Sequence, residues 1–336
     1  MLNDTLNSSG ITEASSPSDA FAWTAHDIIA GISFSVMTII VVLGNVICMI
    51  GLQNTRIKHT TRILMYSLTA ADICVGIFNL FPIAVASFTN TWILGHTTCF
   101  IAVIIGGAPY YTSIWTLVAM AVERYIAVTK PLQYRVIFTV SRARTIVMSI
   151  WLTSHMYEVL VCGLQGFQVY FDPLTDQCWS LGTAGSDSII KVVIIVLIFG
   201  PFVAFSSLYI RIYLIIRHQA ARRRAMFDSV SSIPQASENN NGISSRDMRA
   251  AKTFMFITLS FSVAIIPLSV LFAVENITKT SSNEWVYFVT TLTALSNSWI
   301  NTFIYFFRDK SFKNSVANLF GKTYSNVQSR SLSSNW

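Results

Sequence analysis

One charged triplet in this sequence is placed where a conformational switch would need it. Glu123-Arg124-Tyr125 stands at the inner end of a long apolar stretch that begins near Cys99. A guanidinium is not left in hydrocarbon, so Arg124 must lie at the membrane rim, where the adjacent Glu123 carboxylate can hold it until a partner arrives. No Ser/His/Asp set, Cys/His metal-ligand set or phosphate-binding glycine set stands where it could work, so we expect a protein that is not an enzyme.

The composition requires a membrane around this triplet. Of the 336 residues, 53% are hydrophobic and only 12% are charged, which is too apolar for a water-soluble domain of this length. A helix crosses the hydrocarbon layer with about 20 apolar residues. The expected fold is therefore an all-α membrane protein, a seven-transmembrane helix bundle, with spans near 27–52, 61–88, 97–129, 143–166, 188–217, 248–275 and 284–306.

The charge distribution orients these spans. All but two of the 23 Lys and Arg residues, Lys191 and Lys279, fall on one side, which predicts a cytoplasmic C-terminus and an extracellular N-terminus. The acceptor sequences at Asn3, Asn7 and Asn276 then all lie outside, where they can be glycosylated. The net charge of +7 lies beside the spans, which favours anionic lipids and a cytosolic protein partner over nucleic acid.

The remaining segments are short. We expect an extracellular glycosylated segment at 1–26 without a cleaved signal peptide, the membrane domain at 27–306, an amphipathic surface helix at 307–320 and a flexible cytoplasmic tail at 321–336. The Ser- and Asn-rich stretch 228–245 is expected to be a flexible inner loop. Cys99 and Cys178 face the oxidising side and are expected to form a disulfide.

Several polar residues stand inside the predicted spans, where each needs a reason. If the spans bundle, their oxygens converge around the carboxylate of Asp72, and a sodium ion would suit such an oxygen cage. The alternative is a protonated, hydrogen-bonded Asp72 without an ion. The residues of this candidate sodium site are Asn45, Asp72, Ser113, Asn297, Ser298 and Asn301.

Motifs in each predicted span resemble the rhodopsin-like (class A) G-protein-coupled receptors over nearly the whole of 27–320. The matching residues are Gly44-Asn45, Leu68, Ala71-Asp72, Trp92-Ile93-Leu94-Gly95, Cys99, Glu123-Arg124-Tyr125, Trp151, Pro201, Tyr209, Phe261, Pro267, Asn301 and Tyr305. The resemblance implies a plasma-membrane receptor that passes an extracellular signal to a heterotrimeric G protein, with arrestin and receptor kinases as further partners.

The resemblance also implies a switch and its hinge. Arg124 is expected to be held at rest by Glu123 and by Asp247, and then released to the G protein. Tyr209 and Tyr305 are expected to swing toward it. The packing triad and hinge that accompany this switch are Ile114, Pro201, Phe261 and Pro267.

Departures from the family pattern bear on which ligand is sensed and on how its binding is coupled to the switch. Ile265 replaces the usual span-six tryptophan, and Thr302, which can hydrogen-bond its own helix, replaces a span-seven proline. Gly106 stands where amine receptors carry an aspartate, so no amine salt bridge is available. Leu295 replaces the retinal-binding lysine of opsins, and Pro109 predicts a bend or a local packing adjustment in span three.

The pocket implied by the alignment is largely apolar or aromatic, which favours a lipophilic or peptide ligand. Glu158 is either a ligand contact or a carboxylate satisfied within the bundle, with His155 as a hydrogen-bond partner. The implied pocket residues are Gly106, Gly107, Tyr110, Glu158, Trp179, Val193, Leu197, Ile265, Leu268, Thr291 and Leu295.

Two other functions stay open at this point. A seven-helix protein that signals without ligand, or without a G protein, is compatible with Ile265 and Thr302. A transporter or channel would need inverted repeats and charges along a path, and the sequence has neither a repeated half nor deep acids beyond Asp72 and Glu158.

Overall fold

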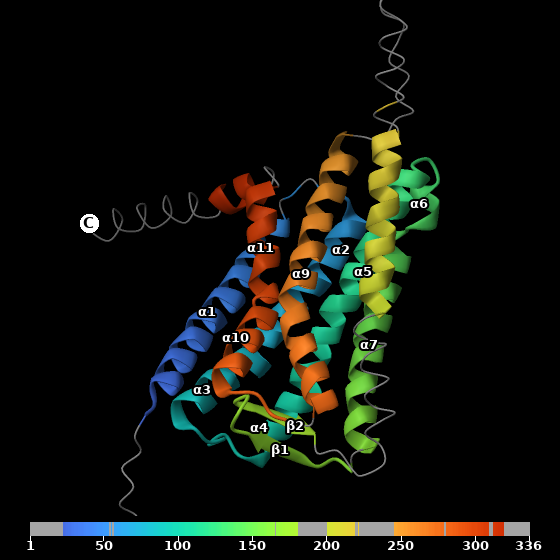
Figure 1. Cartoon of the computed structure of the whole chain (residues 1–336). Helices are drawn as coiled ribbons and strands as arrows, with labels where there is room; N and C mark the ends of the chain where they lie inside the picture. The colour runs from blue at the N-terminus through green and yellow to red at the C-terminus, as the bar shows by residue number, and fades with distance from the viewer. Residues whose placement is uncertain are drawn as a thin grey trace, which may run out of the picture.

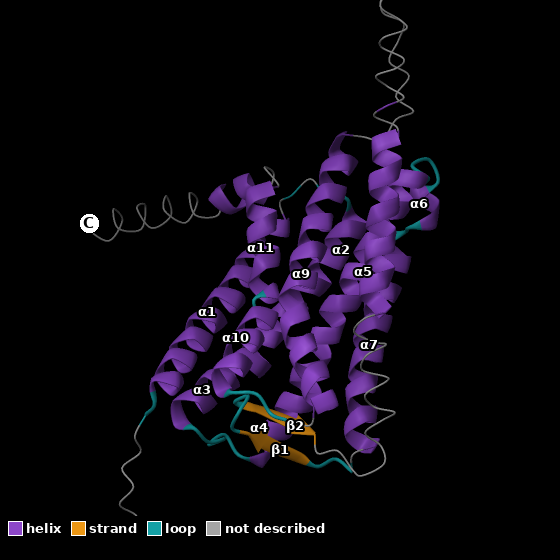
Figure 2. Cartoon of the chain, in the orientation of Figure 1, coloured by secondary structure: helices purple, strands orange, loops and turns teal. Residues whose placement is uncertain are grey.

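The computed structural model describes residues 23–53, 55, 57–164, 166–180, 200–218, 221, 245–278, 280–308 and 312–318, with the backbone alone at 245–250 and 276. Within these residues, long helices run side by side as a bundle, and a hairpin and a short helix lie at one end (Figure 1). Figure 2 shows how completely helix dominates. The expected all-α membrane bundle is confirmed.

The elements follow one another in the order that the apolar runs predict. They are α1 (Ala25–Gln53), α2 (His59–Val75), η1 (Gly76–Leu80), α3 (Phe81–Thr89), α4 (His96–Ile101), η2 (Ala102–Gly106), α5 (Gly107–Thr129), α6 (Tyr134–Ile137), α7 (Val140–Leu164), β1 (Val169–Asp172), β2 (Gln177–Ser180), a helix at Gly200–His218, α9 (Ser245–Thr278), α10 (Glu284–Leu295) and α11 (Asn297–Arg308).

The described residues include six helices that are long and apolar enough to cross a membrane. The seventh predicted span is divided into α10 and α11, each 12 residues long, by a turn at Ser296. Neither half reaches across alone, because a span needs about 20 residues. The Ser296 hydroxyl donates to the Thr293 carbonyl at 2.6 Å and so satisfies part of the interrupted backbone.

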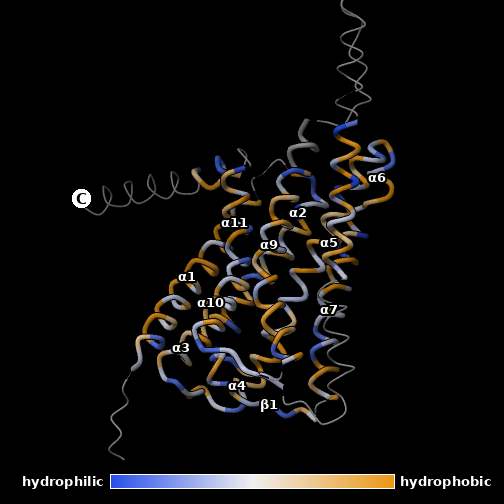
Figure 3. The backbone as a smooth tube through the Cα atoms, in the orientation of Figure 1, coloured by the Kyte–Doolittle hydropathy of each residue, from blue (hydrophilic) through white to orange (hydrophobic). Residues whose placement is uncertain are grey.

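Hydrophobic residues run along most of the length of the helices (Figure 3), and apolar side chains are exposed on the outside of the bundle as well as buried inside it. Ile39 and Leu43 of α1 and Met148 and Leu152 of α7 are all exposed. Water would disfavour such faces, whereas lipid chains solvate them. These faces explain why hydropathy alone located the spans.

Two π-helical turns, η1 and η2, precede the prolines at positions 82 and 109. A proline has no amide hydrogen and crowds the carbonyl four residues earlier, and a π turn accommodates both effects. Asn79 Nδ2 donates to the Gly106 carbonyl at 2.6 Å and joins the two turns. A Cβ at position 106 would lie 3.0 Å from Asn79 Oδ1, so the close approach requires glycine.

The hairpin β1–β2 is antiparallel, with Phe171 opposite Cys178, and lies at the same end as α4 and the beginning of α1 (Figure 1). The expected disulfide between Cys99 and Cys178 is present and ties the hairpin to the beginning of span three. The hairpin is therefore fixed over this end of the bundle.

The helical segment 312–318 packs on the opposite end of α1. Phe312 and Val316 are buried, and Ser315 Oγ donates to the Gly51 carbonyl at 2.8 Å. A Cβ at position 51 would lie 3.0 Å from the Phe312 ring. The described part of the expected surface helix is thus anchored on the bundle by its apolar residues.

Candidate functional site

The Glu123–Arg124 pair lies buried at the end of α5 that is opposite the hairpin. Arg124 donates through Nε to Glu123 Oε2 and through Nη2 to Glu123 Oε1, the second bond at 2.5 Å. A two-point guanidinium–carboxylate contact is stronger and more directional than a single one. Arg124 is therefore held by its own neighbour in this conformation.

Two further elements close this cage, and neither was predicted from the sequence. Thr61 of α2 accepts a hydrogen bond from Arg124 Nη2 and donates to Glu123 Oε1 at 2.9 Å. Tyr134 of α6 donates its hydroxyl to the same Glu123 oxygen and shares a 2.8 Å hydrogen bond with Thr60. The side chains that hold Arg124 thus come from α2, α5 and the loop after α5.

Tyr134 remains a hydrogen-bond donor in this setting. Burial, together with the nearby Glu123 carboxylate, raises the pKa of Tyr134 above that of an ordinary phenol. Lys58 Nζ lies 4.3 Å from the centre of its ring, at cation–π distance. The loop helix is therefore fastened to the cage by charge as well as by a hydrogen bond.

An aromatic bridge connects Arg124 with the predicted tyrosines. The Arg124 guanidinium carbon lies 5.4 Å from the centre of the Phe254 ring on α9, and Phe254 meets Tyr305 of α11 edge-to-face at 6.2 Å. The hydroxyls of Tyr209 and Tyr305 are buried and have no hydrogen-bond partner among the described residues. Two unpaired buried hydroxyls suit residues that find partners in another conformation.

For the other predicted switch residues, the structure shows fewer contacts. Tyr125 is half-buried against the main apolar cluster. Asp247 lies in α9, but its side chain is outside the described part, so its expected contact with Arg124 stays a prediction.

Two residues of the predicted packing triad lie in one apolar cluster. Ile114 and Phe261 are fully buried there, and Pro201 is buried at the beginning of the helix at Gly200–His218. Phe202 stacks on Phe261 at 5.7 Å and passes this contact to α9. Pro267 lies inside the continuous helix α9, between Phe261 and the hairpin end, and a proline at such a position is the usual cause of a kink.

The predicted oxygen cage gathers around Asp72, which is fully buried on α2. Asp72 accepts hydrogen bonds from Ser113 Oγ at 3.3 Å and from Asn301 Nδ2 at 3.0 Å. The amide oxygens of Asn297 and Asn301 are buried without a hydrogen-bond partner among the described residues. Asn301 contacts the buried carboxylate directly, and oxygen ligands are the ones that a hard cation prefers.

Asn45 and Ser298, the other two residues predicted for this site, fasten α1 to α11. Asn45 Nδ2 donates to the Ser298 carbonyl at 2.8 Å. The Thr302 hydroxyl, which can hydrogen-bond its own helix, here donates to Asn45 Oδ1 on α1 at 3.2 Å. Position 302 lies against Gly44, where the missing side chain allows the two helices to approach. The threonine therefore forms a contact between helices that a proline could not form.

The predicted pocket residues do not form a single group. Ile265 and Tyr110 belong to the main apolar cluster, whereas Leu295 packs against a second cluster formed with α1 and α3. Trp179 of β2 meets Phe272 of α9 edge-to-face at 6.0 Å. Thr291 is buried on α10 and Leu268 is half-buried on α9, while Val193 and Leu197 lie outside the described residues.

His155, which could provide a hydrogen bond to Glu158, makes its contact within its own helix instead. His155 Nδ1 meets the Trp151 carbonyl at 2.9 Å, and its ring stacks on Trp151. The Glu158 carboxylate instead lies against Gly107, where an added Cβ would be 2.6 Å from Oε1. The side chain turns toward α5 because Gly107 leaves room for it.

The glycosylation acceptors are only partly described. Asn276 lies in the last turn of α9 rather than in a loop, and its side chain is outside the described part, as are Asn3 and Asn7. Among the described residues, no group of three or more His, Cys, Asp or Glu side chains could hold a metal ion.

Three residues that complete the Arg124 cage were missed by sequence reasoning. Thr61, Tyr134 and Phe254 are common residue types, and no local pattern marks them. Only the order of the spans could have pointed to two of them. In a bundle, the beginning of span two and the loop after span three both lie near the end of span three that holds Arg124.

These features together define a membrane receptor of the seven-helix class. The chain matches the 7 transmembrane receptor (rhodopsin family) over residues 44–305, which is well over half of its length. It therefore belongs to the rhodopsin family of G-protein-coupled receptors, whose members are receptors rather than enzymes, and it signals as such a receptor.

Individual relatives are distant. The adenosine receptor A2a of Canis lupus familiaris is 25% identical over 296 residues, covering 82% of this chain and 68% of that receptor. Trace amine-associated receptor 9 of Homo sapiens is 27% identical over 276 residues, covering 80% and 78%. The adenosine receptor A2b of Gallus gallus is 25% identical over 308 residues, covering 83% and 84%.

Proposed function

We propose that this receptor rests with Arg124 caged, and that an extracellular ligand favours a conformation in which Arg124 is released to a heterotrimeric G protein. The observation that supports this is the buried guanidinium, engaged at once by Glu123, Thr61 and Phe254. A guanidinium held in this way is not available to a partner. Movement of α9 at Phe254, or of the loop at Tyr134, would loosen it.

The loop that holds Tyr134 also offers a surface for the G protein. Leu132 is 89% exposed and Val136 is 72% exposed, although both lie outside the spans where lipid would cover them. Exposed apolar side chains beside Lys130 and Arg135 suit a protein partner with an apolar pocket and an acidic rim. A partner that takes hold of this loop would pull directly on the Tyr134–Glu123 hydrogen bond.

We place the receptor in the plasma membrane with the N-terminus and the hairpin outside and the C-terminus inside. The charge asymmetry of the loops supports this orientation, and so does the disulfide at the hairpin end, because disulfides persist on the oxidising side. Glycans at Asn3, Asn7 and Asn276 follow from it. Each Asn→Gln substitution should then remove one glycosidase-sensitive mobility step.

The ligand we propose is lipophilic or a peptide. The relatives named above are receptors for adenosine and trace amines, but Gly106 cannot form a salt bridge with an amine. The apolar and aromatic character of Tyr110, Ile265 and the Trp179–Phe272 pair supports a ligand with apolar groups. A screen of lipids and peptides with a promiscuous G protein tests this choice, and activation by simple amines alone would contradict it.

We further propose an allosteric sodium ion at Asp72. The residues that would hold it are Asp72, Ser113, Asn297, Ser298 and Asn301, with Asn45 beside them, and the ion would neutralise the buried carboxylate. The two orphaned amide oxygens support this assignment. Sodium should lower basal nucleotide exchange compared with potassium, and Asp72→Asn should remove the difference. Indifference of the native chain to sodium would favour the protonated carboxyl.

Regulatory partners follow from the cytoplasmic segments, which lie outside the described residues. We propose that anionic lipid headgroups contact the Arg222-Arg223-Arg224 run. We also propose that receptor kinases and arrestin act on the tail. Its candidate acceptors are Thr323, Ser325, Ser329, Ser331, Ser333 and Ser334.

The decisive experiment measures G-protein nucleotide exchange at equal surface density. Arg124→Ala should abolish stimulated exchange, whereas Arg144→Ala, which removes an exposed arginine on α7, should preserve it. Unchanged stimulated exchange in Arg124→Ala would refute the proposal. Ion flux without nucleotide exchange would favour a channel, and exchange that no ligand alters would favour the ligand-independent alternative.

A further inference from the structure

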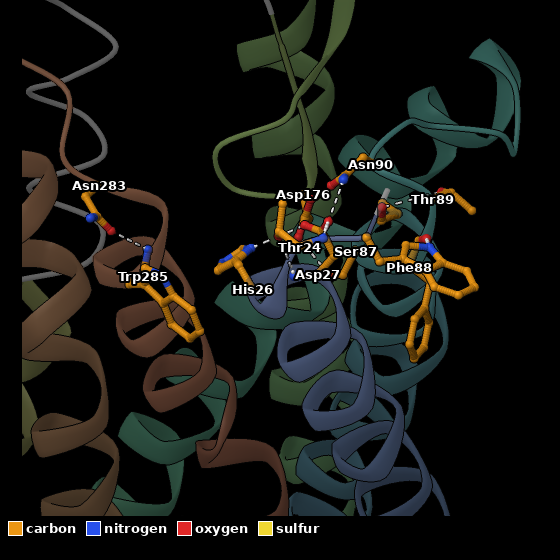
Figure 4. Close-up of polar contacts among 12 residues, drawn as sticks. Thr24, His26, Asp27, Ser87, Phe88, Thr89, Asn90, Asp176, Asn283 and Trp285 are labelled. Atoms are coloured by element: carbon orange, nitrogen blue, oxygen red, sulfur yellow. Dashed lines mark hydrogen bonds and ion pairs between the residues drawn. The ribbon is translucent and has the colours of Figure 1, made fainter. Parts of the chain in front are cut away.

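Three acid–base side chains are buried together at the hairpin end of the bundle (Figure 4). His26 and Asp27 begin α1, and Asp176 lies in the turn between β1 and β2. They are 6%, 4% and 5% exposed, respectively. Among the described residues, no Lys or Arg pairs with either carboxylate, so their charge is balanced there by neutral donors only.

On each carboxylate, the neutral donors bind to a single oxygen, Oδ2. Asp27 Oδ2 accepts from the Thr24 amide at 2.8 Å and from Asn90 Nδ2 at 2.7 Å. Asp176 Oδ2 accepts from Ser87 Oγ at 2.6 Å. The contacts tie the beginning of α1 and the hairpin to the end of α3, but they supply no positive charge.

His26 is the group that can supply it. Its Nδ1 lies 3.7 Å from Asp27 Oδ1, and its Nε2 is buried without a hydrogen-bond partner among the described residues. The rings of Trp285 and Phe288 on α10 meet the imidazole edge-to-face at 5.0 and 5.9 Å. An added proton would turn the Asp27 contact into an ion pair and place a cation beside two aromatic rings.

We propose that the receptor binds an extracellular proton at His26, in the cluster that it forms with Asp27 and Asp176, and that the bound proton stabilises the resting conformation. The proton would link α1, α3, α10 and the hairpin, which the disulfide already joins to span three. These contacts coexist with the caged Arg124 in one conformation. A ligand that binds one conformation better shifts the population toward it, so acidification lowers basal signalling.

The other ionisable groups near the cluster are accounted for. Asp172 of β1 accepts hydrogen bonds within its own turn, from the Leu174 amide and the Thr175 hydroxyl. Glu275 accepts from Tyr287 at 2.6 Å. Glu284 is exposed at the beginning of α10, and α3 contributes only the neutral Ser87 and Asn90. Among the described residues, His26 is therefore the one basic side chain in the cluster with the two carboxylates.

Asp176 contributes to the stability of the folded protein in acid. Burial raises the pKa of this carboxyl above its usual range, while a charge on His26 lowers it. A carboxyl whose pKa is raised in the folded protein binds its proton more tightly there than in the unfolded chain. Its contribution to stability is therefore present in acid and is lost as the pH rises through the raised pKa.

The test uses purified full-length receptor without ligand, in buffers between about pH 7.5 and 5.5, the range in which imidazole titrates. Basal nucleotide exchange should fall about fivefold on acidification, and the melting temperature should rise. His26→Phe, which retains an aromatic ring, and His26→Gln should lose both responses, and Asp176→Asn should weaken them. The control is His96→Phe, which removes an exposed histidine outside the cluster and should retain both.

A pH response that persists in both His26 variants, or a rise of basal exchange in acid, would overturn the proposal. If the His26 variants do not reach the cell surface, the Asp176→Asn response decides: an unchanged pH dependence there contradicts the proton site. The inference rests on the orientation proposed above. Purified receptor could respond to pH while receptor in cells does not respond when only the external pH is changed. That result would refute the orientation and leave the site itself intact.

Discussion

Tyr134→Phe tests the Arg124 cage at the contact that the sequence did not reveal. The substitution keeps the ring, its stacking on Phe138 and its contact with Lys58, and removes only the hydroxyl. That hydroxyl donates to the Glu123 carboxylate and pairs with Thr60. The resting conformation therefore loses one charge-assisted hydrogen bond.

The size of the effect follows from this geometry. A hydrogen bond to a charged group contributes about 1.5 to 3 kcal/mol. We take the lower value, about 1.5 kcal/mol, because Arg124 and Thr61 continue to hold Glu123. About 1.4 kcal/mol corresponds to a tenfold change in an equilibrium constant, so the active fraction should rise about tenfold while it is small.

The assay is basal nucleotide exchange in membranes that carry equal receptor density. Tyr66→Phe is the matched control, because Tyr66 is half-buried on α2 and its hydroxyl makes none of the described hydrogen bonds. Basal exchange in Tyr134→Phe that equals that of the native chain and of Tyr66→Phe would refute the cage as drawn here.

Substitutions at three other contacts test the packing. Gly107→Ala should lower the melting temperature by displacing the Glu158 carboxylate, at a cost of about 1 to 3 kcal/mol, and should cost little in a Glu158→Ala background. Cys99→Ser or Cys178→Ser opens a loop with a sequence separation of 79 and should cost about 4 kcal/mol, with equal losses in the single and double variants. Thr302→Val leaves an acceptor on α1 unpaired and should lower the free energy of unfolding by about 1 to 2 kcal/mol, whereas no change in the melt would show that the contact contributes nothing.

The bundle could be predicted because the apolar composition of each span shows that it must be surrounded by lipid or protein. Long apolar runs need lipid or protein on every side, so hydropathy located the spans without any knowledge of their partners. The seventh span shows the limit of this reasoning, since hydropathy does not reveal the turn at Ser296. Hydropathy also does not reveal the π turns before the prolines at 82 and 109, because their form depends on how η1 and η2 meet.

The amino-acid sequence by itself determined which residues could act: a guanidinium next to a carboxylate at a membrane rim, and oxygen-bearing side chains buried inside spans. The tertiary structure alone decided what they touch. Thr61 and Tyr134 reach Glu123 from other elements, Thr302 contacts α1, and Asp176 of the hairpin joins the cluster at the beginning of α1 that contains His26 and Asp27. Span position follows from local transfer free energy, whereas these contacts follow from how helices distant in the chain pack together.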